Sequence, residues 1–316
     1  MSRCSLRSGK ITRNGIKAKI PVNIDLRPVS IYNKIIETSL SDHRRGIAMN
    51  RLFYRIADPT KNITVLVTNE IDKEHYVPVA TQLLRVIKDA EQVAFLVEPH
   101  RKGSRIGLCM MGGEFCGNAT LSAAALMAQK DGLKPEEESD IQLDVSGADH
   151  ALTCHIKAHN PTKGFFKGGG RQTDLFTGTL EMPLPKSFTA YQGLPAVCFR
   201  GIIHIIVPVG MMKAKAIEES IRSAAHALRT PALGMLLWDE KNSYMTPCVY
   251  VRDTDSLTWE RGCASGSAAI GAWRAYKAQT SISTDVHQPG GMIRTDANHT
   301  DGKITKLAIT GQVILR

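Results

Sequence analysis

Two short stretches of this chain share a pattern that constrains its fold, because in each a cysteine separates an expected strand from an alanine-rich helix. Cys116 is followed by Gly-Asn-Ala-Thr and Cys263 by Ala-Ser-Gly-Ser, and both stretches lead into a run of small residues. The two cysteines lie 147 residues apart. A strand-cysteine-helix unit that recurs at this distance indicates an internal duplication. We therefore expect two similar halves that combine helices and strands.

Hydrophobic periodicity supports an α/β (α+β) fold of short strands and single helices. Residues 62–68 and 196–209 are rich in β-branched residues and predict strands. Residues 75–90 and 118–132 have helical spacing of apolar side chains. The C-terminal residues 303–316 alternate in the manner expected for a closing pair of strands.

These elements suggest three segments in the chain. Residues 1–48 form a basic N-terminal extension, 49–170 the first half and 171–316 the second half, with the last strand free to return to the first half. The glycine-rich stretch 157–174 is the expected linker between the halves. Three consecutive glycines without a following helix are a weak signal for a nucleotide site, so we interpret this stretch as a surface loop, a hinge or part of a lid.

The positive charge is concentrated in the N-terminal extension. Residues 1–48 contain ten lysines and arginines but three acidic residues, so they account for +7 of the formal net charge of +10. The remaining chain is close to neutral, which argues against nucleic acid as a partner. The extension is compatible with a start codon assigned too far upstream or a vector-derived segment, with a disordered basic arm, or with a targeting peptide.

Composition narrows the class of protein further. The content of 43% hydrophobic and 22% charged residues is typical of a globular protein, and no apolar run is long enough to predict a transmembrane helix. Seven cysteines without a Cys-x-x-Cys pair predict neither a disulfide framework nor a zinc site. We expect a cytoplasmic enzyme that has no metal, acts on a small molecule, and binds neither nucleic acid nor membrane; a homodimer remains open.

Two cysteines at helix N-termini suggest proton transfer. Unpaired backbone N–H groups and the helix dipole favour a thiolate there, which predicts pKa values near neutrality for Cys116 and Cys263. A thiolate and a thiol on opposite sides of an amino acid could remove and return its α-proton and so invert the stereocentre. The residues expected to donate backbone N–H groups to the substrate carboxylate follow the two cysteines: Gly117, Asn118, Ser265, Gly266 and Ser267.

The stretches "CGNAT" and "ERGCASGS" resemble the two active-site motifs of the diaminopimelate epimerase family of cofactor-independent amino-acid racemases and epimerases. The resemblance extends from about residue 51 to the C-terminus and includes "DPTKNITVLV" near its start. It implies two pseudo-symmetric domains, each with a curved mixed or antiparallel sheet around a central helix, and catalysis without pyridoxal phosphate. It also implies that Cys116 and Cys263 are the catalytic acid and base, and that Asn62, Glu260 and Arg261 contact the substrate.

Several departures from the family motifs bear on the substrate. Gly262 directly precedes Cys263, whereas the family has about five residues between its Glu-Arg-Gly and the cysteine turn. Residues 201–204 read Gly-Ile-Ile-His where diaminopimelate enzymes have Gly-Asn-Pro-His. Missing ligands for a distal carboxylate disfavour diaminopimelate itself. We therefore expect a divergent racemase, such as the histidine racemases, acting on one amino acid with a basic or heteroaromatic side chain.

Three alternatives remain at this point. The chain could be a diaminopimelate epimerase proper, an isomerase of the phenazine-pathway type, or a non-catalytic binding protein on the same scaffold. Phenazine-pathway isomerases replace the cysteines with carboxylates or other residues, and Glu114, two residues before Cys116, could serve as such a base or simply as a hydrogen-bonding residue. The presence of both cysteines favours racemisation.

Overall fold

The computed structural model describes residues 52–163 and 172–316. The basic extension expected at 1–48 and the glycines at the centre of the expected linker lie outside the described residues. The helical elements of the described part are η1 (Lys73–His75), α2 (Tyr76–Val86), α3 (Gly117–Lys130), α4 (Ala214–Ala227) and α5 (Ala264–Ala278). None of these is both long enough and apolar enough to cross a membrane.

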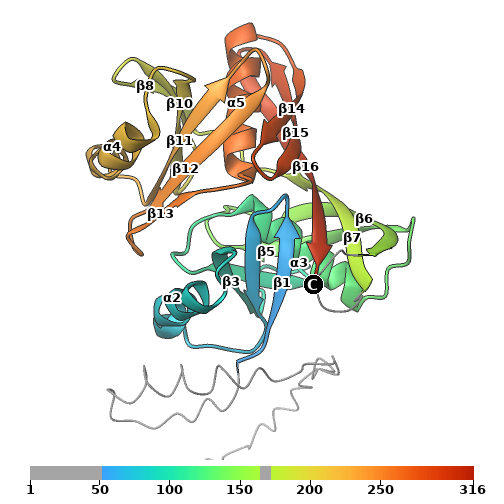
Figure 1. Ribbon diagram of the computed structural model, residues 1–316. Coiled ribbons are helices and arrows are strands. Elements are labelled where there is room, and N and C mark those ends of the chain that lie inside the picture. The colour runs from blue at the N-terminus through green and yellow to red at the C-terminus, as the bar shows by residue number, and fades with distance from the viewer. Residues whose placement is uncertain (1–51, 164–171) are drawn as a thin grey trace, which may run out of the picture.

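The N-terminal lobe is built around α3, the helix that begins after Cys116 (Figure 1). Its outer helix α2 packs on β3, where Tyr76 stacks on Phe95 with ring centroids 3.9 Å apart. The strands of this lobe are β1 (Tyr54–Pro59), β2 (Ile63–Val67), β3 (Ala90–Val97), β4 (Ile106–Met110), β5 (Glu138–Val145), β6 (Leu152–Lys163) and β7 (Gln172–Glu181).

The C-terminal lobe repeats this plan around α5, the helix that begins after Cys263 (Figure 1). Here the outer helix is α4, which packs on β11 and β12. The strands of this lobe are β8 (Ser187–Tyr191), β9 (Leu194–Cys198), β10 (Ile202–Pro208), β11 (Ala232–Asp239), β12 (Tyr244–Val251), β13 (Ser256–Trp259), β14 (Ile282–Gln288) and β15 (Gly291–Thr300).

One strand, β16 (Lys303–Leu315), joins the two lobes. It pairs antiparallel with β15 of the C-terminal lobe, with β7 of the N-terminal lobe, and near its end with β1. The β1–β16 pairing closes β1–β7 and β16 into a ring of strands, because each of these strands also pairs with the next. The sheet is mixed, since β2–β3, β4–β5 and β10–β11 are parallel. The expected curved mixed sheets around central helices are confirmed.

The sequence prediction for residues 303–316 was wrong in one respect, because this segment is a single strand and not a pair. Its alternating pattern continues through Gly311, which lies opposite Gly178 of β7. A Cβ atom at Gly178 would lie 2.7 Å from Leu121 Cδ2 of α3. Glycine at this position therefore lets β7 lie close against the central helix.

The expected linker 157–174 also needs correction, because its described residues belong to the paired strands β6 and β7. Ala158 lies opposite Phe176, and both side chains are buried. The chain first passes from the N-terminal to the C-terminal lobe after β7, between Glu181 and Ser187, and returns along β16. We retain the division into two halves as a proposal and place its boundary at this crossing.

The central helices are unusually well buried. In α3, all residues from Gly117 to Ala128 are buried, which small side chains permit because strands surround the helix. Buried hydroxyls in this helix bond to backbone carbonyls one turn earlier, as Ser122 Oγ does to Asn118 O at 2.8 Å. Leu121 is the large side chain of this helix that faces β7, and it is 1% exposed.

Replacing Leu121 with alanine is expected to lower the free energy of unfolding by about 2–5 kcal/mol, because it leaves a cavity in a core that cannot collapse. Urea denaturation followed by circular dichroism measures this change. Leu184, which is 44% exposed, is the matched control, and Leu184→Ala is expected to cost less than about 0.5 kcal/mol. Equal losses in the two variants would contradict the assignment of Leu121 to the core.

Candidate active site

Cys116 and Cys263 occupy equivalent positions, since each is the N-cap residue of a central helix. Both have extended backbone conformations, with φ −135° and ψ 113° at Cys116 and φ −123° and ψ 107° at Cys263. Each sulfur accepts a hydrogen bond from the amide three residues later, at 3.5 Å from Ala119 N and 3.3 Å from Gly266 N. The sulfurs thus take the place of the oxygen that usually caps a helix.

The two helix N-termini are in direct contact. A Cβ atom at Gly117 would lie 2.8 Å from the Cβ of Ala264, so the residue after Cys116 must be small for the helices to approach this closely. Asn118 Nδ2 donates to Gly262 O at 2.8 Å and ties the start of α3 to the turn before α5. These contacts bring together two cysteines that are far apart in the sequence.

Both cysteines line one pocket between the lobes. Its empty volume, which includes open solvent, is about 600 Å³. Three carboxylates line it, from Glu91, Glu114 and Glu260. Its other polar lining residues are Gln92, Asn118, Ser256, Thr258 and Ser265, and its apolar walls include Met111, Phe115, Ile202, Val249 and Val251.

Of the ten site residues predicted from the sequence, six line this pocket: Cys116, Gly117, Asn118, Glu260, Cys263 and Ser265. Asn62, Arg261, Gly266 and Ser267 do not belong to its lining. Within residues 52–163 and 172–316, no group of three or more histidine, cysteine or acidic side chains is arranged to hold a metal ion.

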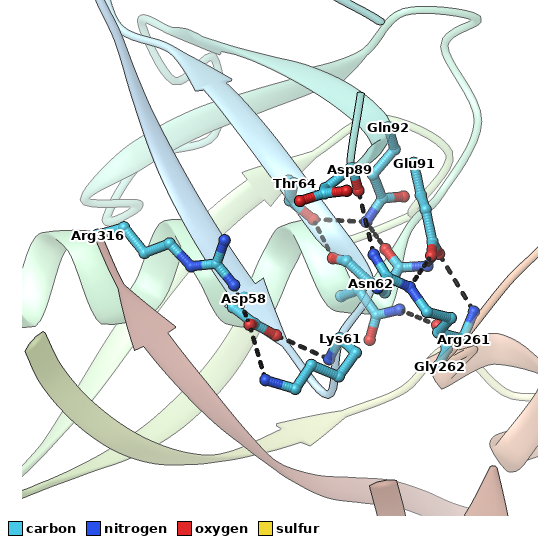
Figure 2. Close-up of polar contacts among 11 residues, drawn as sticks. Asp58, Lys61, Asn62, Thr64, Asp89, Glu91, Gln92, Arg261, Gly262 and Arg316 are labelled. Carbon is cyan, nitrogen blue, oxygen red and sulfur yellow. Dashed lines mark hydrogen bonds and ion pairs between the residues drawn. The ribbon is translucent and has the colours of Figure 1, made fainter. Parts of the chain in front are cut away.

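Figure 2 shows a buried polar network that includes Asn62, Thr64 and Gln92, and Cys116 is bonded to Gln92 of this network. Its thiol donates to Gln92 Oε1 at 2.9 Å, and Gln92 Nε2 in turn donates to Asn62 Oδ1 at 2.6 Å and to Thr64 Oγ1 at 2.7 Å. Asn62 Nδ2 donates to Glu91 Oε2 at 2.9 Å. Asn62 is fully buried and therefore supports the pocket wall, while direct contact between Asn62 and the substrate stays a prediction.

Arg261 connects this network to the other lobe. Its Nε donates to Glu91 Oε1 at 2.9 Å, and its backbone amide is 3.3 Å from Glu91 Oε2 (Figure 2). A third bond runs from its guanidinium to Asp89 O at 3.2 Å. Because Arg261 is engaged in these bonds, the structure gives it a role in holding the lobes together at the pocket.

Around Cys263 a second polar network fixes the turn before α5. Cys263 N donates to Gln288 Oε1 at 2.6 Å, and Gln288 Nε2 donates to Ser267 Oγ at 2.9 Å. Ser267 Oγ donates to Cys263 O at 2.8 Å. The amides of Gly266 and Ser267 bond to Sγ and O of Cys263, so both were wrongly expected to be free for a substrate.

The prediction of near-neutral thiol pKa values is also wrong for the substrate-free protein. Burial raises the pKa of Cys116 to about 12, against partial lowering by the Ala119 amide. Burial and the neighbouring Glu260 carboxylate raise the pKa of Cys263 well above its ordinary value. Desolvation and like charge therefore outweigh the helix N-terminus, and both sulfurs are protonated near neutral pH.

Glu260 is the titratable group next to Cys263. Burial raises its pKa to about 8, although a hydrogen bond with the Cys263 side chain lowers it and Glu91 raises it further. A carboxylate with a pKa of about 8 has a proton affinity suited to exchange with a neighbouring thiol.

Sequence reasoning did not assign a partner to His204, which lies behind Ser265. His204 Nε2 is 3.0 Å from Ser265 Oγ, and this hydroxyl is 3.7 Å from Cys263 Sγ. Full burial lowers the pKa of His204 to about 3, so the ring is neutral. A Cβ atom at Gly234 would lie 2.2 Å from His204 Nδ1, so glycine is required there to make room for the ring.

The arrangement of these lobes also occurs in solved structures of a predicted epimerase and a probable proline racemase. A predicted epimerase from Pseudomonas aeruginosa has a TM-score of 0.57 at 15% identity, over 83% of this chain and 96% of that chain. A probable proline racemase from Agrobacterium radiobacter K84 has a TM-score of 0.55 at 12% identity, over 83% and 90%. These similarities define the fold class as that of the proline racemases and related epimerases.

Sequence comparison identifies the family. The family model described as the histidine racemase CntK N-terminal domain matches residues 52–315. A histidine racemase of Staphylococcus aureus (strain Mu50) is 28% identical over 262 residues, which are 81% of this chain and 92% of that protein. One from Fusobacterium nucleatum subsp. nucleatum is 30% identical over 263 residues, 79% and 93% of the two chains. The chain belongs to the histidine racemase CntK family of amino-acid isomerases.

The packing of His204 against β11 can be tested with a double-mutant cycle. Gly234→Ala is expected to lower the free energy of unfolding by about 1–3 kcal/mol, because its methyl group overlaps the ring. In a His204→Ala background the same change should cost less than about 1 kcal/mol, since the ring is gone. Urea denaturation of the four proteins gives the coupling energy, and additive effects would contradict the contact.

The raised pKa of Glu260 also predicts that the stability of the protein depends on pH. Its pKa rises from an ordinary 4.5 to about 8 on folding, so the folded chain binds this proton more tightly than the unfolded chain. The stability it contributes is complete below about pH 4.5 and is lost as pH rises through 8. We expect Glu260→Gln to flatten the stability curve between these limits, by up to about 5 kcal/mol.

Urea denaturation at half-unit pH intervals measures both stability curves. The exposed Glu98 provides the control, because Glu98→Gln removes the same charge from an accessible position and should leave the wild-type slope unchanged. A wild-type slope that persists in Glu260→Gln would show that another group causes it.

Proposed function

We propose that the protein is a histidine racemase that needs no cofactor and transfers the α-proton between Cys116 and Cys263. The observation that carries this proposal is that two N-cap cysteines from the two lobes line a single pocket. Membership of the histidine racemase family supports histidine as the substrate.

The substrate carboxylate would bind at the paired helix N-termini. The first amides of a helix have no acceptor within the helix, and Gly117, Ala264 and Ser265 occupy these first positions in α3 and α5. These three residues also line the pocket, and the Ser265 hydroxyl adds a further donor. Donors aimed at the carboxylate stabilise the negative charge that develops when the α-proton leaves.

Three carboxylates in the pocket favour a cationic partner. Glu91, Glu114 and Glu260 supply carboxyl oxygens that can accept hydrogen bonds from N–H groups of an amino acid, although Glu91 is also paired with Arg261 and Glu260 keeps its proton up to about pH 8. Carboxyl oxygens offer no donor to a second carboxylate on the substrate, and any that are charged repel it. The pocket therefore supports histidine over diaminopimelate, whose distal end carries a carboxylate.

Proton transfer requires one thiolate, which Glu260 can generate. Glu260 and Cys263 lie close enough for each to shift the pKa of the other. Transfer of the Cys263 proton to Glu260 leaves a thiolate at Cys263 and a neutral carboxylic acid. The thiolate then removes the α-proton from one face of the substrate, and the Cys116 thiol donates its proton to the opposite face. The result is the inverted amino acid, a Cys263 thiol and a Cys116 thiolate.

The other enantiomer reacts through the same steps in reverse. In that direction the Cys116 thiolate removes the α-proton and the Cys263 thiol supplies the new one. The Ala119 amide, 3.5 Å from Cys116 Sγ, and the Gly266 amide, 3.3 Å from Cys263 Sγ, stabilise whichever sulfur is charged.

The test is α-proton exchange of L- and D-histidine in D₂O, followed by NMR together with the optical rotation of the product. Cys116→Ser and Cys263→Ser are each expected to lower the rate of inversion at least about 100-fold, because each removes one of the two acid-base groups. The controls are Cys109→Ser and Cys198→Ser, which change free cysteines outside the pocket lining and should retain activity.

The outcomes separate the alternatives. Exchange with inversion of histidine that depends on both cysteines supports the proposal. Inversion of diaminopimelate in preference to histidine would favour an epimerase of that class. No exchange with any amino acid under reducing conditions would contradict racemisation and favour a binding protein or an isomerase.

A further inference from the structure

The pocket contains a carboxylate, Glu114, that takes no part in the proposed proton transfers. Glu114 lines the pocket two residues before Cys116, in the loop between β4 and α3. Its Oε2 atom is buried and has no hydrogen-bond partner among the described residues. An open acceptor in a buried position is costly unless a ligand supplies a donor.

This carboxylate is held in place by its own loop. Burial raises the pKa of the Glu114 carboxyl, and the nearby backbone amides of Glu114 and Gly112 lower this pKa in part. Ser146 Oγ donates to Glu114 O at 2.7 Å, and Met110 N donates to the same hydroxyl at 3.0 Å. The position of Oε2 is therefore set before any substrate binds.

Glu114 lies in the part of the pocket left for the side chain of the substrate. The two sulfurs flank the α-carbon and the helix N-termini hold the carboxylate in the proposed function, on which this inference rests. Much of the remaining lining comes from the loop of Met111–Phe115 and from β12 and β13, with further residues from β3, β10 and β11. The Met111–Phe115 loop and β12 are in contact, since a Cβ atom at Gly112 would lie 3.3 Å from Val251 Cγ1 and 2.7 Å from Glu114 Oε2.

The chemistry of this subsite suits a flat side chain with an N–H group. Phe115 and Val251 offer apolar surface, and Ser256 and Thr258 add hydroxyls. We propose that Glu114 is a specificity residue, whose open oxygen accepts a hydrogen bond from an N–H group on the substrate side chain. An imidazole satisfies this oxygen, whereas a thienyl ring of similar size has no donor and a second carboxylate is repelled.

The experiment compares kcat/KM for histidine with kcat/KM for 3-(2-thienyl)alanine, measured as α-proton exchange, in wild type and Glu114→Ala. Loss of a hydrogen bond to a charged group should lower the value for histidine about 10- to 100-fold. The value for thienylalanine should stay within about threefold, because that substrate makes no such bond. Glu114→Gln keeps the size of the side chain and should fall between wild type and Glu114→Ala. The control Glu98→Ala removes a carboxylate from an exposed position and should change neither value.

The results that would contradict the proposed function differ from those that would contradict the role of Glu114. If wild type exchanges no amino acid, the proposed function fails. If wild type racemises histidine and Glu114→Ala lowers both substrates equally, Glu114 does not select the side chain and the inference is wrong. Loss of kcat for every substrate in Glu114→Gln would instead make Glu114 an acid or base, which also overturns the inference.

Discussion

The contact between the N-termini of α3 and α5 is the constraint on which the site depends. Each helix is surrounded by strands of its own lobe, so its first turn can face the other lobe only if the residue after the capping cysteine is small. Gly117 and Ala264 meet this condition, and the Asn118 bond to Gly262 fixes their register. The burial that allows this contact also removes water from the two sulfurs, and the chemistry of the pocket follows from that.

Burial and charge set the protonation of the site more strongly than the helix dipoles do. A helix N-terminus contributes a partial positive charge that falls off within one turn, whereas a fully buried thiol loses the whole hydration of its thiolate. The carboxylates that line the pocket act in the same direction as burial. A substrate that brings an ammonium group offsets this negative charge, so binding itself favours formation of the thiolate. In the proposed mechanism, substrate binding therefore helps Glu260 to generate the thiolate.

Short sequence patterns predicted those parts of the structure that depend on neighbouring residues in the chain. The two cysteine turns, the small residues after them and the central helices follow from motif and periodicity, and the resemblance of the motifs predicted the family. The partners of these residues were not predictable, because Gln92, Gln288 and His204 are brought to the cysteines by strand pairing between distant segments. The error at 303–316 has the same cause, since an alternating pattern does not reveal whether a strand turns back or continues along several neighbours.

That long strand also explains how the two lobes share part of their hydrophobic core. The buried core around the two central helices includes Ile309 and Val313 of β16, which pair with β7, and Leu307 and Ile304, which lie opposite Ala297 and His299 of β15. One strand therefore contributes to the packing of both central helices. The Arg261–Glu91 ion pair is a second connection between the lobes, beside the pocket. A pocket between lobes with two such connections keeps the cysteine turns in register, and it still leaves an opening through which a small amino acid can enter.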